Sequence, residues 1–253
     1  MTTVQNILDY LDALAPRDLK MDWDNVGLLC GRRETPVTKV LVALDPFAHV
    51  CEEAAQWGAE LIVTHHPLIF RAPREITDRT DMGQSILTLC AHGISAINAH
   101  TNFDCAPGGV NDVLAQALEL KNIQTIEGQT LLRSGDFEAT LPEFLAHVKA
   151  KLGCEGLRYV SSGKPVRKVA VGGGSCGDCL QQALAAGCDT FVTADIKYNT
   201  FWDARSLGIN LIDAGHFHTE NPSIPILAGK LRTAFPDLEI KISETHADCM
   251  KYY

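Results

Sequence analysis

A repeated strand–helix–strand pattern constrains the fold of this 253-residue chain more than any other feature. When the chain is aligned with itself, Lys39-Val-Leu-Val-Ala43 matches Lys168-Val-Ala-Val-Gly172, and Leu61-Ile-Val-Thr64 then matches Thr190-Phe-Val-Thr193. The segments between these runs favour a helix, and a glycine precedes the second run of each copy. Each copy therefore predicts a βαβ unit with a right-handed crossover.

The repeat extends to a third strand in each copy. Residues 93–100 resemble residues 208–216 with one residue inserted. His100 is then followed four positions later by Asp104, just as His216 is followed by Glu220. A chance match of β-branched residues is the alternative for any one segment. The two copies, however, agree in the order of their segments, in the spacing between them and in the His-x-x-x-carboxylate element at the end, which argues against chance. We expect an α/β fold made of two related Rossmann-like halves.

The remaining segments complete the predicted domain organisation. Further elements are expected as an amphipathic helix over 3–14, a helix over 141–152, a last helix over 226–233 and a strand over 238–242. The expected division is a first α/β half over 1–124, a short connecting β-α-β segment over 125–165 and a second α/β half over 166–253.

Composition excludes several function classes. The formal net charge of −9 argues against a general nucleic-acid binder, although a single nucleotide remains possible because a bound metal supplies positive charge. No apolar run has the length of a membrane span, and the first residues lack a secretory signal, so we expect a cytoplasmic protein. Nine scattered cysteines do not resemble a disulfide framework.

Histidines gather where the predicted strands end. Five of the nine lie in Thr64-His-His-Pro67, His100-Thr-Asn-Phe-Asp104 and Asp213-Ala-Gly-His-Phe-His-Thr-Glu220, and each segment follows an apolar β-branched run. Ligands of open α/β sheets bind just beyond the carboxyl ends of the strands. Imidazole nitrogens and carboxylate oxygens are ligands of zinc, manganese and non-haem iron. These segments predict a metal site.

Each candidate ligand also has a simpler interpretation. His65 and His66 would point to opposite faces of a continuing strand, but a bend at Pro67 could bring both rings to one cavity. His216 and Glu220 share one face if their segment is helical, whereas Glu220 could instead be a solvated first-turn acid. We expect Asp104 in a turn, where an Asx turn is the alternative. We expect His218 to lie behind the ligands or at the surface.

Two further motifs resemble known functional patterns. Gly172-Gly-Gly-Ser-Cys-Gly177 fits a dinucleotide-binding pattern after a strand, but the repeat favours a tight strand-to-helix turn whose N–H groups could approach a phosphate. Cys176 and Cys179 form a C-x-x-C pair without a second cysteine pair, so we interpret them as incidental thiols rather than as a redox or zinc site.

Six segments together resemble the Nif-three-like family, whose members are also labelled GTP cyclohydrolase I type 2 homologues. They are Trp23-Asp-Asn-Val-Gly-Leu28, Thr64-His-His-Pro67, Ala99-His-Thr-Asn-Phe-Asp104, Gly172-Gly-Gly174, Thr193-Ala-Asp-Ile-Lys-Tyr198 and Gly215-His-Phe-His-Thr-Glu220. The resemblance covers essentially the whole chain and matches the short form of the family. It implies the Nif-three-like fold, a dinuclear centre of divalent ions (zinc, iron or manganese) and a toroidal homohexamer.

By the same resemblance, the metal ligands are His65, His66, Asp104, His216 and Glu220. His100 lines the same cavity and is a candidate catalytic residue for proton transfer. The chain departs from the family pattern twice, because Asn199 replaces a histidine and Ala194 replaces a glycine. These departures put a proton-transfer role at position 199 in doubt.

The predicted function is that of a metal-dependent hydrolase acting on a nucleotide-like substrate. The family label suggests hydrolytic opening of a purine ring, and it is carried over by resemblance alone. The alternative is a non-enzymatic regulatory or scaffold protein with structural or sensory ions. An enzyme site keeps an open coordination position, which a sequence does not reveal.

Overall fold

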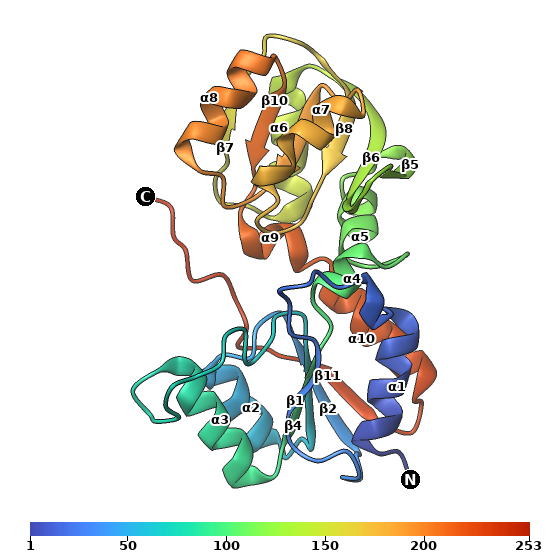
Figure 1. The fold of residues 1–253 in the computed structure, drawn as a ribbon, viewed down its shortest axis with the longest axis vertical. Helices are drawn as coiled ribbons and strands as arrows, with labels where there is room; N and C mark the ends of the chain where they lie inside the picture. Colours follow the sequence, from blue (N-terminus) through green and yellow to red (C-terminus); the bar gives the residue numbers. More distant parts are fainter. The chain divides into compact units, whose positions relative to one another are not determined.

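A computed structural model describes residues 1–253 as two compact units, each built on one β-sheet with helices on its faces (Figure 1). The first unit comprises Met1–Ala106 and Ile224–Ala247. The second unit comprises Pro107–Ser223 and Asp248–Tyr253. The expected α/β class is confirmed in both.

The sheet of the first unit has the strand order β1-β4-β3-β2-β11. Its strands are β1 (Gly27–Cys30), β2 (Lys39–Ala43), β3 (Leu61–Thr64), β4 (Ser95–Asn98) and β11 (Glu239–Ile242). The last four are parallel, and only β1 is antiparallel to its neighbour β4. Because helices cover both faces, β3 and β4 are buried along their whole length.

Four helices flank this sheet. They are α1 (Val4–Leu14), α2 (Ala48–Trp57), α3 (Asp81–His92) and α10 (Ser223–Ala234). In Figure 1, α2 and α3 lie on one face, and α1 and α10 lie on the other. The Tyr10 ring contacts Phe235 edge-to-face, and its hydroxyl donates to the Lys230 carbonyl, which joins α1 to α10. The expected first and last helices are both confirmed.

The sheet of the second unit has the order β5-β6-β8-β9-β10-β7. Its strands are β5 (Lys121–Ile126), β6 (Gln129–Ala139), β7 (Arg158–Val160), β8 (Val166–Val171), β9 (Thr190–Thr193) and β10 (Asn210–Asp213). The central strands β8, β9 and β10 are parallel, and the other three pair antiparallel with their neighbours. The parallel centre is the second copy of the predicted repeat.

Helices cover both faces of this sheet as well. They are α5 (Val110–Ala117), α6 (Leu141–Leu152), α7 (Leu180–Ala185) and α8 (Tyr198–Leu207). Alternate residues of β8 face opposite sides, so that Val169 and Val171 pack with α5 and α6, whereas Ala170 packs with α7 and α8. Thr140 and Glu143 form a capping box at the start of α6, as the sequence of a helix with proline in its first turn favours.

The two halves share hydrogen bonds, glycine conformations and strand register that secondary-structure propensity alone would not produce. Glu60 and Asp189 occupy matching positions, and each carboxylate accepts hydrogen bonds from two consecutive backbone N–H groups near the start of the first strand of its repeat. The matching glycines, Gly58 and Gly187, end their helical segments with φ of 74° and 77°. The register between first and second strands is also the same in both halves. The internal repeat is therefore structural.

Two short helices follow the third strands of the two repeats, one directly after His100 and the other containing His216 and His218. They are α4 (Thr101–Cys105), directly after β4, and α9 (His216–Glu220), directly after β10. Every helix of the structure is too short or too polar to cross a lipid bilayer.

Candidate functional site

A cluster of three imidazoles lies at the carboxyl ends of β3 and β4. Strand β3 ends at Thr64, and the bend that follows brings the His65 and His66 rings to 5.0 Å between centroids. The His100 ring lies 5.1 Å from that of His65 and 5.5 Å from that of His66. One nitrogen of each ring lies within 4.8 Å of one nitrogen of the others. The predicted bend is confirmed.

Asp104 lies beside this cluster, but in a helix. Its Oδ1 is 3.5 Å from His65 Nε2, and its backbone N–H donates to the His100 carbonyl as part of α4. The prediction that Asp104 lies in a turn is therefore wrong. The side chain of Asp24 accepts from the backbone N–H of Thr101 and so stabilises the helix start. Asp24 is far away in sequence, so local propensity could not reveal this helix.

Each ring of the cluster is held through Nδ1, and each Nδ1 faces an oxygen acceptor. The pairs are His65 with the Ala99 carbonyl at 2.9 Å, His66 with Asp45 Oδ1 at 2.6 Å, and His100 with Asp24 Oδ1 at 2.7 Å. A carbonyl or an ionised carboxylate can only accept, so Nδ1 carries the proton in all three rings. The lone pair then lies on Nε2, which is the atom that a metal ion would take.

The charge of Asp24 supports this assignment. Burial raises the pKa of Asp24, but hydrogen bonds from His100 and Thr101 outweigh burial and lower the pKa to about 2. Asp24 is thus anionic at neutral pH and accepts from His100 rather than donating to it.

The second unit carries a matching element at the end of β10. On α9, His216 Nε2 lies 3.1 Å from Glu220 Oε2, which confirms the i, i+4 pairing expected for a helix. Glu220 is only 3% exposed, so it is not a solvated first-turn acid. His216 Nδ1 lies 2.7 Å from Asp195 Oδ2, so this ring too is held through Nδ1 by a carboxylate. Asp195 occupies the position that matches His66 in the repeat.

The glycine-rich segment after β8 packs against α9. Gly174 has φ of 61°, and a Cβ at this position would lie 2.2 Å from Glu220 Oε1. The Gly174 N–H donates to Thr219 Oγ1 at 3.0 Å, and the Gly173 N–H donates to Asn111 Oδ1 at 2.6 Å. The expectation that these N–H groups approach a phosphate is therefore wrong. The glycines instead allow the backbone to come close to Glu220.

The other polar groups of these segments have separate contacts. His218 Nδ1 lies 3.1 Å from the Leu152 carbonyl, and its Nε2 lies 3.3 Å from Asp248 Oδ2. The Cys176 thiol donates to the Gly173 carbonyl, and all nine cysteines are free thiols. A hydrogen bond from Cys176 lowers the pKa of Cys179.

Sequence reasoning missed the three carboxylates that hold the rings. Asp24 and Asp195 lie inside segments that carry the family resemblance, and Asp45 follows β2 directly. The histidine that each aspartate holds lies at least 21 positions away in the sequence, so only the position of Asp45 and Asp195 after apolar runs could have suggested a role.

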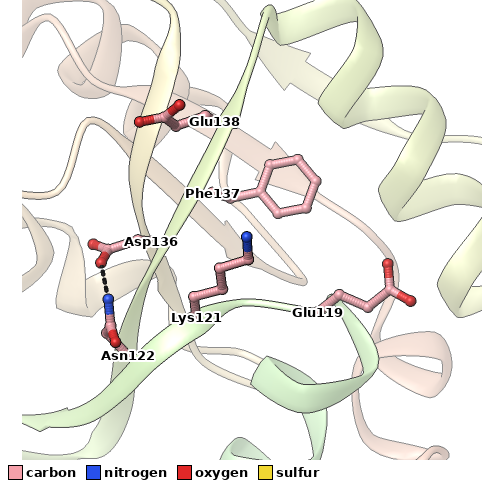
Figure 2. Close-up of a pocket in the computed structure, with 6 residues that line it drawn as sticks. All are labelled: Glu119, Lys121, Asn122, Asp136, Phe137 and Glu138. Carbon is pink, nitrogen blue, oxygen red and sulfur yellow. Dashed lines mark hydrogen bonds between the residues drawn. The ribbon is translucent and has the colours of Figure 1, made fainter.

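A separate pocket of about 730 Å³ lies on the second unit beside β5 and β6 (Figure 2). It is lined by Glu119, Lys121, Asn122, Asp136, Phe137 and Glu138, and Asn122 donates to Asp136 across 2.7 Å. The lining contains carboxylates and one lysine but no histidine. This pocket therefore lacks the donor set of the candidate ligands.

Comparison with known proteins places these segments in a family. A relative from Clostridium perfringens, named GTP cyclohydrolase 1 type 2 homolog, is 34% identical, with 98% of this chain and 99% of the relative covered. A Staphylococcus aureus structure described as hypothetical protein SA1388 matches with a TM-score of 0.93 and 30% identity over 99% of both chains. A Bacillus cereus structure described as a protein related to NIF3 matches with a TM-score of 0.90 and 26% identity over 100% of this chain and 99% of that one. The family model described as Duf34/NIF3 (NGG1p interacting factor 3) matches residues 2–249, and the chain belongs to this family.

Proposed function

We propose that this protein is a metal-dependent hydrolase whose divalent ions are bound by two sets of ligands. The first unit supplies His65, His66 and Asp104, and the second unit supplies His216 and Glu220. One observation carries the proposal. Each histidine of these sets has its Nδ1 held by a carbonyl or carboxylate oxygen, so that the lone pair that would coordinate an ion lies on Nε2. Metal-ligating histidines are almost always held in this way.

The donor set fits a divalent ion of borderline or hard character. It combines imidazole nitrogens with the carboxylates of Asp104 and Glu220, and it contains no thiolate. This combination suits zinc, iron or manganese. Five ligands exceed what one tetrahedral ion needs, so we propose two ions per chain.

The residues around the ligands support hydrolysis. A divalent ion bound in such a site lowers the pKa of water and polarises a substrate oxygen. His100 belongs to the imidazole cluster but not to the proposed ligand set, and Asp24 holds its Nδ1 proton. His100 Nε2 can then accept a proton and return it to a leaving group, as general acid–base catalysis requires. A nucleotide-like substrate is supported by the name of the curated relatives.

An untargeted metabolite screen on metal-reconstituted protein tests the proposal. We expect loss of a nucleotide or related phosphate compound with the native protein, and no loss with Glu220→Gln at equal concentration. Metal uptake without turnover of any compound would instead favour the non-enzymatic regulatory or scaffold role.

We also propose the assembly and location that the family resemblance implies, a toroidal homohexamer in the cytoplasm. Light scattering coupled to size-exclusion chromatography measures the assembly directly. A mass of one chain at all concentrations would contradict the hexamer.

A further inference from the structure

Two large aromatic side chains of the first unit are exposed beside the imidazole cluster. Trp23 is 61% exposed and Phe70 is 46% exposed. Their ring centroids lie 5.7 Å apart, and each lies 6.2 Å from the ring of His100. Isolated exposed apolar residues are ordinary, but a pair that adjoins a cluster of candidate ligands is a reason to look for a binding role.

Hydrogen bonds, rather than burial, hold these rings in place. Trp23 and Phe70 lie on two loops that are distant in sequence. The Asn25 side-chain amide donates to the Ile69 carbonyl at 2.7 Å and ties one loop to the other. The amide of Asn98, at the end of β4, donates to the Asn25 carbonyl at 3.0 Å. The two rings are thus fixed to the same strand that leads into His100.

The orientation of the rings leaves room for stacking. The three ring planes meet at 70–84°, so their mutual contacts are edge-to-face and none is sandwiched face to face by another. An exposed aromatic face is a suitable surface for a flat ligand ring, because the π-faces of bases and aromatic side chains stack with little sequence or substituent preference.

We propose that Trp23 and Phe70 form a stacking platform for a planar heteroaromatic ring of the ligand. The ring contacts the platform, and the rest of the ligand reaches the imidazole cluster at His100. The inference rests on the proposed function for the reaction at that cluster, and it adds the ligand class and the two specificity-determining residues. A partner protein or a second copy of the chain covering the same rings is the competing occupant.

Calorimetric titration of the metal-reconstituted full-length protein tests the platform. The probes are guanosine monophosphate and flavin mononucleotide, which carry flat rings, and ribose 5-phosphate, which does not. Base–aromatic stacking contributes about 1–3 kcal/mol, so Trp23→Leu should weaken binding of a ring-bearing probe by roughly 5- to 150-fold. Trp23→Phe keeps a ring and should retain most of the affinity. Trp202→Leu, which removes another tryptophan that is 51% exposed, should change nothing.

Three outcomes would overturn the platform. The first is that neither ring-bearing probe binds more tightly than ribose 5-phosphate. The second is that Trp23→Leu and Trp202→Leu have equal effects. The third is that Trp23→Leu changes the mass of the assembly, which would mean that another chain covers the rings. Metal content, measured on the same samples, is a separate readout: protein without metal contradicts the proposed function, whereas full metal content with no ring preference contradicts the platform alone.

Discussion

At the scale of single residues, the candidate site consists of imidazoles whose protons are placed by oxygen acceptors. His66, His100 and His216 each face an aspartate, and His65 faces a backbone carbonyl. These acceptors fix the orientation of each ring and place its lone pair on Nε2. This arrangement is more typical of histidines at a metal site than of histidines that merely lie near the ends of strands.

Glu220→Gln tests the buried carboxylate of the second set. The substitution keeps shape and volume but removes the anionic charge, so metal affinity should fall by more than the roughly 10–100-fold typical of residues that only orient a ligand. The measurement is competition for zinc against a chelator of known affinity. His218→Gln is the control, because His218 contacts Leu152 and Asp248 instead of the proposed ligands. Equal loss of metal in both variants would show that α9 is merely sensitive to substitution.

The two cysteines near α9 should not matter for metal binding. Replacing Cys176 and Cys179 together with serine leaves every proposed ligand in place, because the proposed set consists of imidazole nitrogens and carboxylate oxygens, which suit the proposed ions. We expect unchanged metal content by elemental analysis. Loss of one ion from the double variant would mean that the ligands have been assigned wrongly.

At the scale of elements, the position of α9 depends on the glycine segment after β8. In Gly174→Ala, the new Cβ meets both an unfavourable φ of 61° and the Glu220 carboxylate. Gly187→Ala is a matched control, since Gly187 has φ of 77° and no atom lies within 4 Å of the new Cβ. The backbone strain costs roughly 1–2 kcal/mol in both variants. Chemical denaturation should therefore show both variants destabilised, but chelator competition should show weaker metal binding only in Gly174→Ala.

The connection between α2 and the segment after β11 should be sensitive to acid. Burial raises the pKa of Glu53, but hydrogen bonds from Ser243, Glu244 and Thr245 outweigh it and lower the pKa to about 2. A carboxylate with a lowered pKa stabilises the fold fully above its ordinary value of 4.5 and loses that contribution as the pH falls through about 2. Solvent screening of this partly exposed group reduces the contribution to roughly 1–2 kcal/mol at neutral pH.

Denaturation of Glu53→Gln at several pH values measures this contribution. The variant should be less stable than the native protein at pH 7, and the difference should shrink between pH 4.5 and about 2. A difference that stays constant over this range would show that Glu53 does not act through its charge.

The sequence could predict those elements whose causes are local. Apolar runs and glycine stops predict strands and helices because their effects reach only a few residues. The His216–Glu220 pairing follows from helical spacing in the same way. Helix α4 and the roles of Asp24 and Asp45 could not be predicted, because their hydrogen bonds join residues far apart in the chain.

At the scale of the whole molecule, the two units use the same structural positions for the proposed chemistry. Polar side chains follow the second strand of each repeat at His66 and Asp195, and a short helix with a carboxylate follows the third strand of each, at α4 and α9. The duplicated sheet therefore explains why the proposed ligands occur as two related sets. Membership of the family is established by the match over residues 2–249, whereas metal binding by these sets is the central claim that requires measurement.

Elemental analysis of the native protein, purified without chelator, tests that claim most directly. We predict close to two divalent ions per chain, because the five proposed ligands exceed the need of one tetrahedral ion. Adding a chelator should lower the melting temperature, since bound metal stabilises only the folded state. Protein that contains no metal, and that takes up neither zinc, manganese nor iron on reconstitution, would contradict the account.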